Sequence, residues 1–153
     1  MSVFVSLRVF VVSFGMLAAM QWLVKEEPAN YPFPQFVKDG TTVWSGVKNP
    51  VAQKHLRAMT PGDRVFYYHT GNEKAVVGIA KVASAPRPDP KDPAGRLYVV
   101  DLVPERALAR PVTLAEVKAV KDFADFPLVR LPRLSVMPVT DDQWAWIEDK
   151  GRG

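Results

Sequence analysis

The sequence predicts an α+β domain, built on a small curved sheet or open barrel of about five or six strands with short helices at its periphery. Short segments rich in β-branched and aromatic residues alternate along the chain with turn residues, as expected for a sheet of short strands. The 14 prolines and 9 glycines are spread along the whole length, which disfavours a helical bundle. A chain of 153 residues that is 48% hydrophobic has the size of one domain with an ordinary core.

Residues 1–20 form an apolar segment in which Arg8 is the only charged residue. One interpretation is a signal-like segment, because Arg8 precedes the apolar residues 9–19. The other is a mis-assigned start, because Met20 could itself begin the chain. The apolar segment is short for a membrane span. Under both interpretations residues 1–20 are an extension outside the domain, which we expect to occupy residues 21–150.

The first elements of the domain are short and extended. Residues 21–25 predict a buried strand, which ends before Pro28 because proline cannot continue a central ladder. Residues 31–40 allow one or two helical turns that end at a glycine. Residues 41–47 then predict an extended segment that presents Trp44.

The central helix has a clear start and a clear end. Asn49 is a good N-cap and Pro50 suits the first helical position, so we expect a helix over residues 50–59. Residues 61–63 then form a turn. Lys54 and Arg57 leave one face of this helix basic. Its core face should carry Val51, Ala52, His55, Leu56 and Met59.

Residues 64–70 predict a strand that is apolar on both faces, so it is either buried on both sides or lines a pocket. Residues 71–72 form a hairpin turn to a second long strand over residues 75–83. Gly78 lies inside that strand, where a glycine often marks the close approach of another backbone or a ligand.

Residues 86–93 read as a proline-rich surface loop, and residues 97–103 as a further strand. Thr113 and Glu116 have the spacing of a capping box, which predicts a short helix as far as Val120.

The last part of the chain predicts a brief turn at residues 123–127 and a final strand at residues 133–139. Thr140 then caps a C-terminal helix with Trp144 and Ile147 on its inner face.

The residue inventory excludes several kinds of chemistry. The chain has no cysteine and only two histidines, His55 and His69, so we expect no disulfide, no metal site and no cofactor. It has no Walker-type glycine pattern, and no pattern places a nucleophile beside a base and an orienting partner. We therefore expect no catalytic residues. The net charge of +4 favours a polyanion only weakly.

Aromatic residues gather around the central helix. Taken singly, Trp44, Phe66, Tyr67 and Tyr68 are each more typical of a core than of a ligand cage. Together, aromatic planes beside small hydroxyl groups and a basic helix are what a site needs to stack an unpaired base and hold its phosphates. Trp44 can therefore be either a core residue or a stacking wall.

Five sequence blocks, in the same order, resemble the EVE domain family, and the resemblance covers nearly all of residues 21–150. They are W-L-V-K-E-E-P at 22–28, W-S-G-V-K-N at 44–49, L-R-A-M at 56–59, G-D-R-V-F-Y-Y-H-T at 62–70 and R-L-S-V-M-P-V at 133–139.

The resemblance implies a PUA-like fold, related to YTH and ASCH domains, with a pocket for a modified base of DNA or RNA and no catalytic activity. The residues expected to bind phosphates are Lys48, Lys54 and Arg57, at and beside the basic face of the central helix. The residues expected to bind the ligand itself are Trp22, Lys25, Glu26, Trp44, Ser45, Val47, Asn49, Tyr68, His69, Thr70, Arg133, Leu134 and Ser135.

The chain departs from the usual family motifs K-S-E-P, W-D-G-V-R-N and Y-H-S at four of these positions. Lys48 and Thr70 are mild changes, whereas Glu26 adds an acid and Ser45 removes one. The last two changes alter the hydrogen bonds that can be offered to a base.

We therefore expect a non-catalytic binding module for nucleic acid that carries a modified base. The alternative is a small-molecule binder or an enzyme that uses the same barrel pocket. We also expect a monomer that lies in the cytoplasm and does not insert into membranes.

Overall fold

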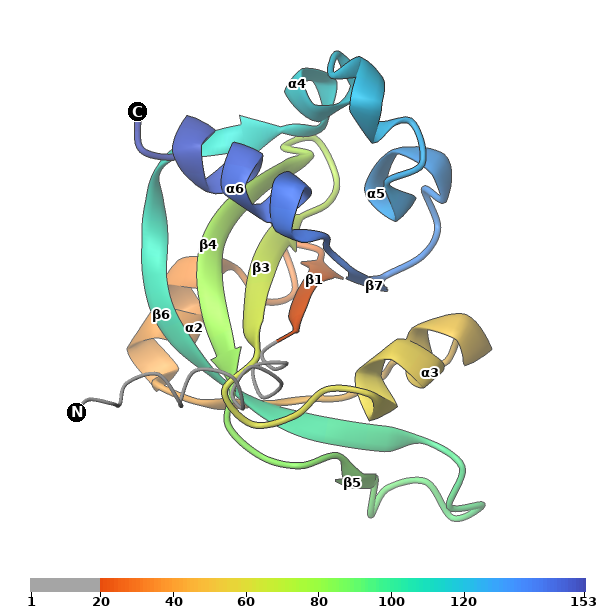
Figure 1. Cartoon of the computed structure of the whole chain (residues 1–153). Helices are drawn as coiled ribbons and strands as arrows, with labels where there is room; N and C mark the ends of the chain where they lie inside the picture. Colours follow the sequence, from red (N-terminus) through yellow and green to blue (C-terminus); the bar gives the residue numbers. More distant parts are fainter. Residues whose placement is uncertain (1–19) are drawn as a thin grey trace, which may run out of the picture.

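The computed structural model describes residues 20–153 and shows a strongly curled mixed sheet that forms a half-barrel (Figure 1). The order of its main strands is β2-β6-β4-β3-β1-β7, and the short strand β5 pairs with β6. This architecture confirms the predicted α+β fold with a curved sheet. Residues 1–20 were predicted to form an extension outside the domain. Residues 1–19 lie outside the described residues, so this stays a prediction.

Most predicted elements are present, with changed lengths. The strands are β1 (Gln21–Glu26), β2 (Thr42–Trp44), β3 (Arg64–His69), β4 (Ala75–Val82), β5 (Arg87–Pro88), β6 (Tyr98–Thr113) and β7 (Val136–Pro138). The helices are α2 (Phe33–Asp39), α3 (Pro50–Arg57), α4 (Leu114–Lys118), α5 (Pro127–Arg130) and α6 (Asp141–Lys150), with a 3-10 turn η1 (Lys121–Phe123). The predicted N-caps Asn49, Thr113 and Thr140 all accept hydrogen bonds from their helices.

Three predicted boundaries are wrong. The strand predicted to end at residue 103 continues as β6 to Thr113, because irregular pairing with β4 lets Pro104 lie within it. The loop at residues 86–93 contains β5, which pairs with residues 98 and 99 of β6. The last strand is only Val136–Pro138, because the residues before it form α5 and a turn.

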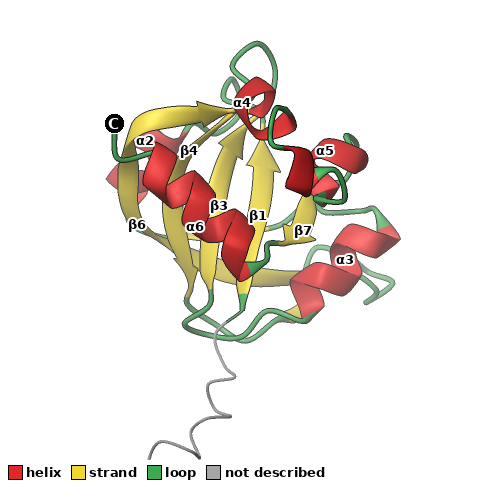
Figure 2. Cartoon of the chain, turned by 45° about the horizontal axis from the view of Figure 1, so that its top comes forward, coloured by secondary structure: helices red, strands yellow, loops and turns green. Residues whose placement is uncertain are grey.

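Strand β3 is buried on both faces, as predicted. On one face Phe66 stacks on Trp144 of α6, with ring centroids 3.6 Å apart and planes at 13°. On the other face Tyr67 contacts Phe33 and Phe36 of α2, at 5.2 and 5.5 Å between centroids. Helices α6 and α2 accordingly lie on opposite faces of the sheet (Figure 2).

The glycine inside β4, Gly78, was predicted to mark the close approach of a backbone or a ligand. The group that approaches it is the side chain of Phe33. A Cβ atom at Gly78 would lie 2.4 Å from the ring of Phe33. Helix α2 can therefore pack closely on this face of the sheet only because residue 78 has no side chain.

Helix α3 lies at the open side of the half-barrel. Strands β2 and β7 are the two ends of the strand path, and α3 follows β2 and contacts both β6 and β7 (Figure 1). Ala52 and Leu56 face the core as predicted, but Val51 is 49% exposed. The prediction for Val51 is wrong because Gln53 is the residue that turns inward, and its amide bonds to the backbone of both Val47 and Tyr98.

Candidate functional site

Two hollows flank helix α3, one on each side. The first, here called the basic cleft, lies between α3 and the β5–β6 hairpin and has a volume of about 680 Å³. Its lining contains four cationic side chains and no carboxylate. The lining residues are Lys48, Pro50, Gln53, Lys54, Arg57, Ala58, Arg96 and Leu97.

The second hollow, here called the apolar groove, lies between the start of α3 and the segment that joins α5 to β7. It has a volume of about 470 Å³. Two large apolar side chains that face solvent, Val51 and Leu131, line it. The other lining residues are Asn49, Arg130, Pro132, Arg133 and Leu134.

The arginines of the described chain differ in ion pairing according to where they lie. Five of the nine, at positions 64, 87, 106, 110 and 152, form ion pairs with carboxylates. The other four have no ion pair within residues 20–153 and line the two hollows: Arg57 and Arg96 the basic cleft, Arg130 and Arg133 the apolar groove. Arginines without an internal partner are therefore concentrated beside α3.

The structure brings many of the predicted site residues to these hollows. Lys48, Lys54 and Arg57, predicted to bind phosphates, all line the basic cleft. Asn49 lines the apolar groove together with Arg133 and Leu134.

Lys25 connects the apolar groove to the end of the sheet. Its ammonium group donates to the carbonyl of Pro132, at 2.9 Å, and lies 5.6 Å from the ring centre of Tyr68. Its backbone N–H donates to the carbonyl of Ser135. Burial lowers the pKa of Lys25 and raises the pKa of Tyr68 to about 12. Lys25 thus contacts the segment that lines the groove, and Tyr68 and Ser135 contact Lys25.

Glu26 and Thr70 lie at the end of β1 and β3, where they bond to the chain itself. The Glu26 carboxylate accepts the N–H of Glu27, at 3.1 Å, and the Thr70 hydroxyl donates to the Glu27 carboxylate, at 2.9 Å. Burial is the main cause that raises the pKa of Glu26.

His69 is fully engaged by the protein. Its Nε2 accepts the backbone N–H of Phe33 at 3.0 Å, so the ring proton is on Nδ1, which faces the carboxylate of Glu73 at 2.8 Å. The imidazole therefore fixes the start of α2 and has no ring nitrogen left for a ligand.

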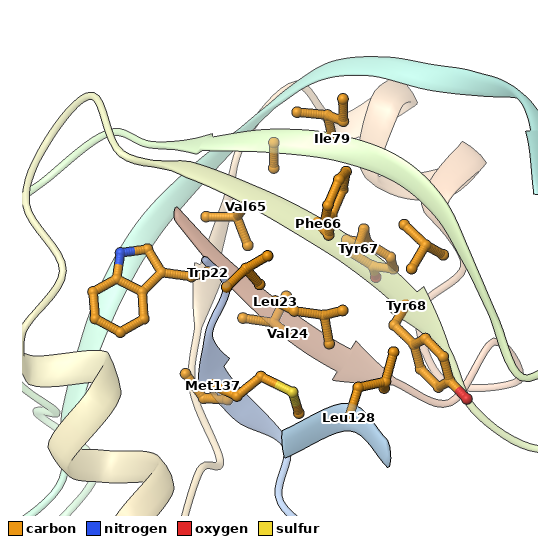
Figure 3. Close-up of a cluster of buried hydrophobic side chains, with 14 of the residues drawn as sticks. Trp22, Leu23, Val24, Val65, Phe66, Tyr67, Tyr68, Ile79, Leu128 and Met137 are labelled. Atoms are coloured by element: carbon orange, nitrogen blue, oxygen red, sulfur yellow. The ribbon is translucent and has the colours of Figure 1, made fainter. Parts of the chain in front are cut away.

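Trp22 and Trp44 are both buried. The indole N–H of Trp22 donates to the carboxylate of Asp63, at 2.9 Å, and Trp22 lies at the opposite end of the core cluster from Tyr68 (Figure 3). Trp44 is 6% exposed and meets Tyr67 edge to face, at 5.5 Å between ring centroids.

Trp44 does not belong to the lining of either hollow, although the segment that follows it leads directly into α3. In that segment Ser45 is exposed, and the carbonyl of Val47 accepts from Gln53. The stacking role predicted for Trp44 stays a prediction.

Sequence reasoning missed the contributions of Arg96, Leu131 and Arg130 to the hollows. Arg96 belongs to a loop that β5 pairing brings opposite α3, and the other two precede β7. Their only signal in the sequence is an exposed arginine or leucine, which does not point to a site.

Residues 20–153 contain no group of three or more acidic or histidine side chains that could hold a metal ion. None of their helices is both long enough and apolar enough to cross a membrane.

Comparison with known proteins shows which family the chain resembles. The model of the EVE domain family matches residues 20–150. Human thymocyte nuclear protein 1 is 27% identical over 130 residues, which cover 70% of this chain and 58% of that protein. The chain thus spans a little over half the length of this relative.

Solved structures show the same fold. The NMR structure of Rpa0253 from Rhodopseudomonas palustris is 42% identical with a TM-score of 0.83, and the match covers 87% of this chain and 93% of that one. Human THYN1 protein in complex with 5-methylcytosine-containing DNA is 24% identical with a TM-score of 0.80, covering 88% of this chain and 99% of that one.

Proposed function

The chain belongs to the EVE domain family, and we propose that it is a non-catalytic module that binds nucleic acid and holds a modified base beside helix α3. The human relative that shares this fold is bound to DNA that contains 5-methylcytosine. That likeness motivates the proposal, and the charges and hollows around α3 support it.

The observation that carries the proposal is the placement of the arginines without ion pairs. Arg57, Arg96, Arg130 and Arg133 all line the two hollows beside α3, whereas the other described arginines are paired with carboxylates. Guanidinium groups bind phosphate oxygens in a planar, two-point geometry. A nucleic-acid strand that crosses α3 would meet such groups on both sides.

The apolar groove is suited to a base. Val51, Leu131 and Leu134 offer apolar contacts for the face of a base, and an apolar pocket with few polar groups is typical of small-ligand sites. The side-chain oxygen of Asn49 accepts two N–H groups of α3, which leaves the side-chain NH₂ group of Asn49 as a donor. Arg133 can donate to a base edge or to the adjacent phosphate.

Trp44 is the aromatic surface that we propose for stacking on the base. It is the last residue of β2, next to the segment that leads into α3, and it is 6% exposed. Because it does not line either hollow, a base in the apolar groove would have to extend beyond the groove to stack on it. An aromatic ring that stacks on a base contributes about 1–3 kcal/mol by alanine substitution.

The alternative is a small-molecule binder or an enzyme at the same site. His69 gives an enzyme no support, because both of its ring nitrogens are bonded within the protein. His55 is half-buried beside Trp22, at 6.2 Å between ring centroids, and burial lowers its pKa. Neither histidine lines the basic cleft or the apolar groove.

Fluorescence anisotropy with a panel of short oligonucleotides, each carrying one modified base, tests the proposal. We expect one modified oligonucleotide to bind more tightly than its unmodified counterpart and than the free modified nucleoside. We also expect affinity to fall steeply as salt rises, because phosphate contacts release counterions. Binding of the free nucleoside that equals oligonucleotide binding, with no salt dependence, would favour the small-molecule alternative.

A further inference from the structure

The far wall of the basic cleft is a loop that is folded by its own hydrogen bonds. The carboxylate of Asp92 accepts the backbone N–H groups of Ala94, Arg96 and Leu97, at 3.2, 2.8 and 2.8 Å. These bonds, with Leu97 the largest contribution, lower the pKa of Asp92. Because its oxygens are used inside the loop, Asp92 fixes the backbone that carries Arg96.

The near wall of the cleft is tied to the sheet by a buried amide. Gln53 of α3 accepts the N–H of Tyr98 and donates to the carbonyls of Tyr98 and Val47, at 3.0, 3.1 and 2.8 Å. The guanidinium of Arg57 then lies over the ring of Tyr98, at 4.4 Å from its centre. The two walls and one cation of the cleft are therefore held in place before any ligand arrives, which reduces the ordering cost of binding.

The electrostatics of the cleft select an anion. Lys48, Lys54, Arg57 and Arg96 line it, no carboxylate does, and none of these four side chains has an ion pair within residues 20–153. Two guanidinium groups and two ammonium groups around one hollow match the charge and the oxygen acceptors of a phosphate group.

We propose that the basic cleft binds a phosphate group of the nucleic-acid strand that carries the recognised base, with Arg57 and Arg96 as its direct ligands and Tyr98 positioning Arg57. This inference rests on the proposed function. Under this inference the ligand is a nucleic-acid strand that crosses α3, with the recognised base in the apolar groove and a phosphate in the basic cleft.

The test compares Arg57→Ala and Arg96→Ala with Lys91→Ala, a matched control. Lys91 lies in the same loop as Arg96, is exposed, and does not line the cleft. Lys91→Ala therefore removes one positive charge from the same loop without changing the lining of the cleft. Affinity for one labelled single-stranded oligonucleotide is measured by anisotropy over a range of salt concentrations. Thermal melts confirm that each variant is folded.

We expect the two arginine variants to bind several-fold more weakly and to lower the salt slope by about 0.7 each, the value for one phosphate contact on a single strand. Lys91→Ala should leave the slope close to that of the wild type. Equal losses in all three variants would mean general surface attraction and would overturn the cleft assignment. The cleft assignment would also be overturned if the two arginine variants bound the oligonucleotide with the affinity and the salt slope of the wild type.

The positioning role of Tyr98 has its own readout. Tyr98→Leu should weaken binding and lower the salt slope as Arg57→Ala does, and the double variant should lose no more than Arg57→Ala alone. Tyr98→Phe keeps the ring and should restore wild-type binding. A Tyr98→Leu protein that melts at a lower temperature but keeps the wild-type salt slope would show that Tyr98 is only structural.

Competition distinguishes the source of the phosphate. We expect inorganic phosphate and an unmodified mononucleotide to displace the labelled strand only at far higher concentrations than an unlabelled strand does. Displacement by inorganic phosphate at the concentration of the competing strand would assign the cleft to free phosphate and overturn the inference. If the wild type binds no oligonucleotide, the proposed function fails too, whereas unchanged binding by the arginine variants refutes the cleft assignment alone.

Discussion

Replacing Trp44 by alanine separates the two roles that this residue can have. Trp44 is 6% exposed and packs against Tyr67, which is fully buried, so the substitution leaves a cavity in the core. A cavity of this kind costs about 3–5 kcal/mol of unfolding free energy. For a domain of this size the melting temperature should fall by about 10–20 °C. Because domains are typically stable by about 5–15 kcal/mol, much of the Trp44→Ala protein should remain folded at room temperature.

If Trp44 also stacks on the base, the folded fraction of Trp44→Ala should bind the preferred oligonucleotide about ten-fold more weakly. The salt slope should not change, because no phosphate contact is lost. Melting curves and anisotropy titrations are measured on the same sample, with Trp44→Phe as a control that keeps an aromatic ring. A lower melting temperature with wild-type affinity in the folded fraction would refute stacking and leave Trp44 a core residue only.

Three further predictions concern stability. Gly78→Ala should lower the free energy of unfolding by about 1–3 kcal/mol, because the new Cβ would lie 2.4 Å from the ring of Phe33, and adding Phe33→Leu should recover part of the loss in chemical denaturation. A chain that starts at Met20 should melt no lower than the full chain, because its charged amino group would lie 3.1 Å from the buried carboxylate of Asp63; a drop of several degrees would contradict this. The guanidinium of Arg110, and after it the N–H of Thr113, lower the pKa of Glu116 to about 2, so its contribution to stability is present above its ordinary pKa of 4.5 and is lost as pH falls towards 2. Glu116→Gln should flatten the unfolding free energy measured against pH over that range.

The parts of the fold that local chemistry determines could be predicted from the sequence. Asn49 and Pro50 fixed the start of α3, and Thr140 fixed the start of α6, because a cap needs only neighbouring residues. The length of β6 could not be predicted. Pro104 suggests the end of a strand, and only the irregular register with β4 lets it lie within one.

The site was harder to predict than the fold, because it is assembled from segments that are distant in the sequence. The basic face of α3 was visible in the spacing of Lys54 and Arg57. Arg96 and Leu131 carried no such signal. Arg96 reaches its hollow because β5 and β6 form a hairpin, and Leu131 reaches its hollow because β7 pairs with β1, a strand far away in the sequence.

The position of the site follows from the incomplete closure of the barrel. The strand path ends at β2 and β7, and α3 fills the space between these ends. A helix with one apolar face can pack its inner side on the core but cannot fill the space on both of its flanks, which leaves a hollow on each side. Both hollows are therefore consequences of the fold, and the residues that line them decide what they bind.

The distribution of ion pairs is the strongest argument that these hollows serve a ligand. An exposed ion pair contributes only about 0.2–1 kcal/mol, so one unpaired arginine costs little and means little. Here the paired arginines include Arg64 and Arg106, which share Glu148 at α6, far from α3 along the chain. All four unpaired arginines of the described chain lie in the linings of the two hollows. The net charge of +4 is small, so the four unpaired arginines beside α3, together with Lys48 and Lys54, support the proposed nucleic-acid site by their placement and not by their number.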